Sequence, residues 1–247
     1  MEIPKIGLGT WNLRGKECES VVESAIKIGY RHIDTAQMYG NEKGVGIGIK
    51  KSGINRGELF VTTKLCSPNT TYNSVTSGVK ESLKNLQLDY LDLVLIHEPY
   101  ASSIEMYRAL EDLQLNGFIK QIGVSNFNRK QIDNLLNNCT VVPYVNQIEN
   151  HIFCQREEYV KYLQARGIKV VAWSPLCADI NKIITNPIIK AIAEKYNKTP
   201  AQIALKFLLQ RDIYIIPKSR NLNRLKENLN LDFNISESDM SALRGLD

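Results

Sequence analysis

Long apolar runs, cysteine pairs and clusters of like charge are all missing from this 247-residue sequence. No apolar stretch approaches the roughly 18 residues that a membrane-spanning helix needs, and residues 1–10 do not resemble a signal peptide. No run of five or more like charges occurs, and the net charge of +5 is only mildly basic, so nothing indicates a nucleic-acid-binding surface. These absences predict a cytoplasmic protein with neither a membrane nor a nucleic-acid partner.

The cysteines and histidines also exclude some functions. The five cysteines are far apart, odd in number and without a CxxC pair, which favours reduced thiols over a disulfide framework. His151 and Cys154 are three residues apart and could share a helix face, but no further Cys or His pair completes a four-ligand site. The sequence therefore predicts no metal centre.

The sequence does contain a regular alternation of short apolar runs with longer segments whose apolar residues are three and four apart. The short runs are typical of strands and the longer segments of helices. Several runs, such as 91–96, are nearly continuously apolar, as are parallel strands buried on both faces. The eight candidate strands are 5–8, 31–33, 60–63, 91–96, 120–124, 144–148, 169–172 and 214–216.

Eight strand–helix units predict an α/β fold, a closed (β/α)8 TIM barrel that forms a single domain over residues 1–247. An open, doubly wound parallel sheet is the competing fold. The glycine-rich stretch 44–48 (GVGIG) does not support a dinucleotide fingerprint, because its spacing is not GxGxxG and it does not directly follow a strand. We expect it to lie within a helix.

Groups that can bond a ligand lie at the carboxyl end of seven expected strands. In a parallel barrel these ends open on one face, where active sites lie. Each group alone has an ordinary interpretation as a cap, a surface residue or a core residue, but together they predict a site at the barrel mouth. They are Asp34, Lys64, His97, Ser125 with Asn126, Gln147, Trp173 with Ser174, and Lys218 with Ser219.

Four side chains near this mouth have complementary chemistry. An ammonium favours a neighbouring phenolate, so Lys64 should lower the pKa of Tyr39, while Asp34 should keep Lys64 charged. His97 could donate a hydrogen bond to a carbonyl oxygen. A proton donor beside a polarising group suits the reduction of a carbonyl, given a source of hydride.

A cofactor site is expected after the last strand. Lys218 and Ser219 precede a helix that carries Arg224 and Asn228 on one face. Helix-start amides and basic side chains form anion sites, and a phosphate site is common at this place in the fold. The group could hold a ribose 2′-phosphate, with Asn228 at the adenine, while Trp173 offers a flat face to a nicotinamide ring.

The chain resembles the aldo-keto reductases over nearly its whole length, and most closely a bacterial-type, diketogluconate reductase-like branch. The matching stretches are 7–11 (GLGTW), 29–42 (GYRHIDTAQMYGNE), 89–97 (DYLDLVLIH), 123–127 (GVSNF), 146–149 (NQIE), 173–176 (WSPL) and 216–219 (IPKS), with Arg224, Glu227 and Asn228.

The resemblance implies an oxidoreductase that reduces aldehydes and ketones with NADPH, most often as a monomer. It implies Tyr39 as the acid/base, assisted by Asp34, Lys64 and His97, and a substrate pocket formed by Trp11, Tyr39, His97 and Glu98. The cofactor-binding residues that it implies are Thr10, Trp11, Asp34, Ser125, Asn126, Gln147, Trp173, Ser174, Pro175, Leu176, Ile216, Lys218, Ser219, Arg224, Glu227 and Asn228. Among these, Ser125, Asn126 and Gln147 would bind the carboxamide of the nicotinamide.

Departures from the family pattern affect the substrate pocket. The first strand begins almost at the N-terminus, so the usual hairpin plug should be short or missing, and the C-terminal loop that covers the pocket in many relatives should be absent. The family often has Trp where this chain has Glu98. We expect a shallow, open pocket of broad specificity, in which Glu98 would disfavour anionic substrates if it faces the pocket.

Two other functions remain open at this stage. A barrel aldolase would form a Schiff base on Lys64, although a neighbouring Asp34 argues against it because the amine must be neutral to attack. A catalytically idle NADPH-binding regulatory subunit is the second alternative, and the intact set of four catalytic side chains argues against it.

Overall fold

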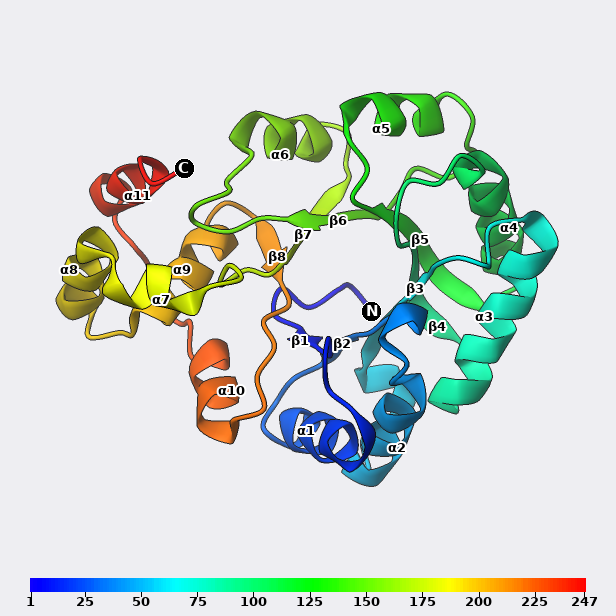
Figure 1. Ribbon diagram of the computed structural model, residues 1–247, viewed down its shortest axis with the longest axis horizontal. Helices are drawn as coiled ribbons and strands as arrows, with labels where there is room; N and C mark the ends of the chain where they lie inside the picture. The colour runs from blue at the N-terminus through cyan, green and yellow to red at the C-terminus, as the bar shows by residue number, and fades with distance from the viewer.

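Eight parallel strands form a ring enclosed by helices in the computed structural model, which describes residues 1–247 (Figure 1). Backbone hydrogen bonds join the last strand to the first, because Gly7 N donates to Ile215 O at 2.8 Å and Ile215 N donates to Lys5 O at 2.9 Å. The ring is therefore closed, which confirms the predicted (β/α)8 barrel over the open sheet. The strands pair in chain order: β1 (Leu8–Gly9), β2 (His32–Asp34), β3 (Phe60–Leu65), β4 (Leu91–Ile96), β5 (Ile119–Ser125), β6 (Val145–Glu149), β7 (Lys169–Trp173) and β8 (Ile213–Ile215).

All eight predicted strands are present, with ends that differ by at most three residues from the prediction. Three helices, α7 to α9, lie between β7 and β8, and none of the helices is long and apolar enough to cross a membrane. The helices are α1 (Gly15–Lys27), α2 (Glu42–Ser52), α3 (Tyr72–Leu86), α4 (Ser103–Leu115), α5 (Arg129–Leu136), α6 (Glu157–Gln164), α7 (Ile180–Thr185), α8 (Pro187–Tyr196), α9 (Pro200–Leu209), α10 (Leu222–Leu229) and α11 (Glu237–Arg244), with 3-10 turns at Gln37–Tyr39 and Arg56–Glu58.

Buried apolar side chains form two clusters, because successive residues of a strand point to opposite faces. A cluster of 56 residues fills the space between strands and helices, and a cluster of eight lies inside the barrel. Ile3 belongs to the inner cluster, and no strand is formed by residues 1–4. The structure thus has no hairpin plug before β1, and the side chain of Ile3 packs against the inner cluster instead.

The same alternation carries polar groups to the barrel mouth. A residue two positions after an inward-facing apolar residue also faces inward, one layer closer to the carboxyl end of the strand. Three of the predicted site residues in or directly after a strand follow inner-cluster residues in this way, in the pairs Leu95 and His97, Val145 and Gln147, and Val171 and Trp173.

The glycine-rich stretch 44–48 lies in α2, as predicted, and its glycines serve helix packing. A Cβ atom on Gly46 would lie 2.4 Å from the carbonyl oxygen of Leu86 in α3, and one on Gly48 would lie 2.7 Å from the carbonyl oxygen of Glu19 in α1. These glycines therefore allow two neighbouring helices to approach closely, and none of them lines the cleft described below.

Candidate active site

A cleft of about 990 Å³ opens at the carboxyl ends of the strands. Its volume is at the upper end of the roughly 300–1,000 Å³ typical of small-molecule sites. Every residue predicted for catalysis, cofactor or substrate lines it, except Lys64, which lies beneath it. The lining residues among those predicted are Thr10, Trp11, Asp34, Tyr39, His97, Glu98, Ser125, Asn126, Gln147, Trp173, Ser174, Pro175, Leu176, Ile216, Lys218, Ser219, Arg224, Glu227 and Asn228.

Lys64 is fully buried and joins two of the predicted catalytic groups. Its Nζ lies 2.5 Å from Oδ1 of Asp34, 2.9 Å from the carbonyl oxygen of Thr35 and 3.2 Å from Oη of Tyr39. The second carboxylate oxygen of Asp34 accepts a hydrogen bond from Nε2 of Gln147 at 2.8 Å. The buried charges thus compensate each other and are hydrogen-bonded, which a buried ion pair requires.

The turn that carries Tyr39 is fixed by a residue that sequence reasoning missed. Tyr39 ends a 3-10 turn that stops at Gly40, in the left-handed region with φ of 63°. The buried Asn41 side chain accepts from Oγ1 of Thr35 at 2.8 Å and donates to the carbonyl oxygen of Thr10 at 2.8 Å. Asn41 therefore ties the tyrosine turn to the loop after β1. Only its place inside the 29–42 motif could have pointed to it.

The pKa of Tyr39 corrects one expectation. Burial raises the pKa of the phenol above its ordinary value of 10.0, and Asp34 raises it further, while Lys64 lowers it by less than these effects together. The lowering by Lys64 is present, as predicted, but it does not decide the net shift, which is upward. Tyr39 is a protonated phenol at pH 7 and can act as a proton donor.

Lys64 keeps its charge, as predicted. Burial lowers the pKa of its ammonium, but Asp34 and Tyr39 raise it by more, so the pKa lies above the ordinary value. A charged amine cannot attack a carbonyl, so this environment does not suit a Schiff-base lysine.

His97 is neutral at pH 7, because burial and the nearby Lys64 lower its pKa to about 4. Its Nδ1 is buried without a hydrogen-bond partner. The single proton of the neutral ring is therefore best placed on Nε2, where it can be donated to a ligand. The His97 ring lies 5.9 Å from the Tyr39 ring, and the Trp11 ring lies 4.9 Å from the same tyrosine, between centroids.

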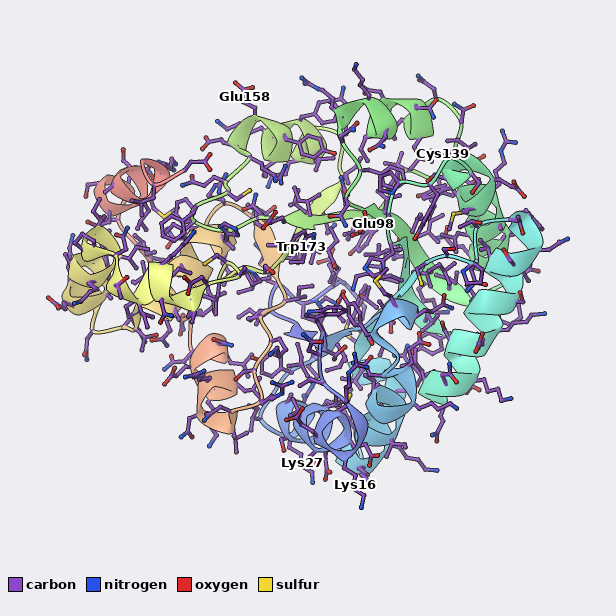
Figure 2. The ribbon with its side chains drawn as sticks, in the orientation of Figure 1. Lys16, Lys27, Glu98, Cys139, Glu158 and Trp173 are labelled. Carbon is purple, nitrogen blue, oxygen red and sulfur yellow. The ribbon has the colours of Figure 1, made fainter.

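Asn126 links Glu98 to Trp173 across the mouth. Its Nδ2 donates to Oε1 of Glu98 at 2.8 Å, and its Oδ1 accepts from Nε1 of Trp173 at 2.8 Å. Figure 2 places Glu98 and Trp173 near the centre of the ring. Glu98 therefore faces the cleft, which the sequence alone left conditional. Beside this link, Oγ of Ser125 donates to the carbonyl oxygen of Gln147 at 3.0 Å.

A basic arm of the cleft, formed by Lys218 and Arg224, follows β8. Both side chains are exposed and neither has a carboxylate within salt-bridge distance, so both are available to an anion. The helix-start amides are less available than expected, because the side chain of Asn221 accepts from the backbone N–H groups of Asn223 and Arg224. The basic side chains, rather than these two amides, make this arm suitable for a phosphate. A long cleft with such an arm fits a phosphorylated dinucleotide.

Part of the cleft wall carried no chemical signal in the sequence. Among the additional lining residues, Ile180 and Ile184 of α7 are one helical turn apart and 38% and 42% exposed. An apolar pair of this kind cannot be told from ordinary helix packing without the structure. The other unpredicted lining residues are Gly9, Met38, Cys177, Ala178, Thr199, Pro200, Ala201, Pro217, Arg220 and Asn221.

His151 and Cys154 pair across a tight turn rather than along a helix face. No group of three His, Cys, Asp or Glu side chains in the protein converges as metal ligands would.

The model of the aldo/keto reductase family matches residues 5–180 and 181–247. The chain belongs to the aldo-keto reductase family. It is accordingly an oxidoreductase that acts on carbonyl groups, which confirms the resemblance inferred from the motifs. Aldo-keto reductases generally depend on a nicotinamide cofactor, and the cleft is consistent with one.

Relatives and solved structures agree with this assignment. The chain is 43% identical to glyoxal reductase of Bacillus subtilis, and the match covers 100% of this chain and 90% of the relative. It is 36% identical to methylglyoxal reductase DkgA of Escherichia coli, and that match covers 99% of this chain and 90% of the relative. An aldo-keto reductase from a Medee basin deep-sea metagenome library superimposes with a TM-score of 0.98 at 41% identity, covering 100% of this chain and 92% of that one. One from Brucella melitensis gives a TM-score of 0.95 at 41% identity, covering 99% and 95%.

Proposed function

We propose that this aldo-keto reductase uses NADPH to reduce small aldehydes and ketones to alcohols, with Tyr39 as the proton donor. The observation that carries the proposal is the contact of the Tyr39 hydroxyl with the buried Lys64–Asp34 pair, beside a neutral His97 at the same cleft. A phenol, an ammonium and an imidazole in this arrangement can protonate a carbonyl oxygen and stabilise the charge that develops.

Each catalytic group has a separate task in the proposed reaction. Bound NADPH supplies the hydride. His97 donates a hydrogen bond from Nε2 to the substrate carbonyl oxygen and so orients the carbonyl and polarises it. Tyr39 gives its Oη proton to the same oxygen, and Lys64, 3.2 Å from Oη, stabilises the phenolate that remains. Asp34 holds Lys64 in place.

The residues that would hold the cofactor follow the length of the cleft. Trp173 would stack on the nicotinamide ring, with Ser125 and Gln147 at its carboxamide. Because both amide atoms of Asn126 are engaged by Glu98 and Trp173, we assign Asn126 a supporting role as well as a binding one. The residues after Trp173 would line the pyrophosphate path, namely Ser174, Pro175 and Leu176.

The basic arm supports a preference for NADPH over NADH. Lys218 and Arg224 have no carboxylate partner, and Ser219 lies between them in the chain, so these residues would bind the 2′-phosphate that only NADPH carries. Thr10, Ile216, Glu227 and Asn228 would complete the cofactor site, with Asn228 at the adenine.

Small 1,2-dicarbonyl compounds such as glyoxal and methylglyoxal are the substrates that we propose. The relatives named glyoxal reductase and methylglyoxal reductase support this choice. Trp11, which lines the cleft, is 48% exposed, so this part of the mouth is open. Such an open mouth fits small compounds that require few contacts.

The test compares the wild type with Tyr39→Phe for NADPH oxidation in the presence of glyoxal. We expect turnover to fall by about 10²- to 10⁴-fold, the usual contribution of a positioned proton donor. NADPH binding should stay within about twofold, read from fluorescence of Trp11 and Trp173, the only two tryptophans of the chain, both of which line the cleft. Tyr72→Phe, on the outer helix α3, is the matched control and should keep wild-type turnover. A Tyr39→Phe enzyme as active as this control would refute the proposal.

The same protein preparations can address the alternative aldolase function. Trapping with borohydride in the presence of a carbonyl compound should leave Lys64 unmodified, because its amine is held charged.

A further inference from the structure

The charges that line the cleft are unevenly distributed between its two ends. All its cationic lining residues follow β8, namely Lys218, Arg220 and Arg224. The other end is lined by Trp11, Met38, Tyr39, His97, Glu98 and Trp173, which we call the substrate end. Asp34 beneath this end is neutralised by Lys64 at 2.5 Å. Glu98 is therefore the only uncompensated charge of the substrate end.

The surroundings of Glu98 leave its charge in place. Its hydrogen-bond partner is the neutral amide of Asn126, at 2.8 Å, and it forms no salt bridge. The adjacent His97 is uncharged at pH 7. Arg129 at the start of α5 lies over the ring of Tyr162, with its Cζ 4.2 Å from the ring centroid, and does not line the cleft.

Building on the proposed carbonyl reduction, we propose that Glu98 makes the substrate end select carbonyl compounds that carry a cation or a hydrogen-bond donor, and reject those that carry a carboxylate. A partly buried carboxylate in the lining of a pocket attracts a positive group of the substrate and repels a negative one, and salt screens it less than an exposed charge. The class of substrate favoured is thus the amino- or hydroxy-substituted aldehyde over the acidic aldehyde.

Glu98 also has a positioning role that must be separated from its charge. By accepting from Nδ2 of Asn126 it orients that amide, so that Oδ1 faces Nε1 of Trp173. Glu98→Gln keeps an acceptor oxygen for Asn126 and removes only the charge. Glu98→Leu removes both, so any effect shared by the two variants reports the charge.

The experiment measures kcat/KM for three aldehydes that differ in charge but little in size: 4-(trimethylammonio)benzaldehyde, 4-nitrobenzaldehyde and 4-carboxybenzaldehyde. Relative to the neutral compound, the wild type should favour the cation and disfavour the anion by roughly fivefold each, so the cation-to-anion ratio is roughly 25. In Glu98→Gln this ratio should fall to near 1. Glu81→Gln removes an exposed carboxylate on the outer helix α3, which does not line the cleft, and should leave the ratio as in the wild type.

A binding measurement distinguishes failure of this inference from failure of the proposed reaction. Quenching of the two cleft tryptophans by the corresponding cationic and anionic benzyl alcohols reports affinity without turnover. A ratio that is the same in the wild type and Glu98→Gln, for turnover and for binding, would overturn the role of Glu98. Absence of turnover for every aldehyde would instead overturn the proposed reaction, and the alcohol affinities would still decide the charge preference.

Discussion

The buried Lys64–Asp34 pair allows a quantitative test of how the site is held together. Replacing either partner alone leaves the other in a place with almost no solvent, since their side chains are both 1% exposed. Two unit charges 2.5 Å apart attract by about 7 kcal/mol at an effective dielectric constant of about 20. Desolvation of both ions cancels much of this attraction, so breaking such a pair typically costs about 3–5 kcal/mol.

A double-mutant cycle with Lys64→Met and Asp34→Asn isolates the pair. Each single variant should lower the free energy of unfolding by about 3–5 kcal/mol, because it leaves a buried charge without its partner. The double variant should lower it by clearly less than the sum of the single changes, with a coupling energy of about 2 kcal/mol or more. Removing both charges together leaves Tyr39 without the ammonium at 3.2 Å, so turnover should remain low although stability recovers.

Urea unfolding followed by circular dichroism and by tryptophan fluorescence measures the cycle. The two probes should give the same midpoint for each variant before free energies are compared. Single changes that cost less than about 1 kcal/mol, or that add within about 0.5 kcal/mol in the double variant, would refute the view that the charges compensate each other.

Three further predictions follow from particular contacts. Burial lowers the pKa of His32 and His97 to about 4, below the ordinary value of 6.5, so the unfolded chain binds more protons than the folded protein between these two values. The free energy of unfolding should therefore fall as the pH drops from about 6.5 to 4. Equal urea midpoints at pH 7 and pH 5 would contradict this prediction. Arg224→Gln should raise KM for NADPH by about tenfold and leave KM for NADH within about twofold, as expected for one lost charge-assisted hydrogen bond. Gly46→Ala should lower the free energy of unfolding, measured with urea, by about 1–3 kcal/mol, because the new Cβ would lie 2.4 Å from a backbone carbonyl oxygen of α3. Gly57→Ala is the control and should be nearly neutral, because no atom lies within 4 Å of its new Cβ.

The sequence was sufficient for the barrel and for the position of most site residues, because both depend on short-range patterns. Alternation along β4 and β7 puts His97 and Trp173 one layer beyond inner-cluster residues, and that pattern can be read without coordinates. The ranking of opposing effects on a buried group cannot be read in this way. The pKa of Tyr39 illustrates the difference, since its neighbours were predicted correctly but the extent of its burial was not.

Local hydrogen bonding in loops was the other limit. Asn221 occupies helix-start amides that were expected to bind an anion, and Asn126 is engaged on both sides by Glu98 and Trp173. Asn side chains can bond backbone or side-chain groups with either amide atom, so their partners depend on loop geometry that no periodicity predicts.

Closure of the ring between β8 and β1 has a consequence for synthesis of the chain. The backbone groups of residues 5–9 find their last partners only in residues 215–217, about 200 residues later in the chain. Until those residues leave the ribosome, the nascent sheet has two open edges, and open edges pair readily with other chains. Aggregation during expression should therefore increase with the time that the chain spends without its last strand.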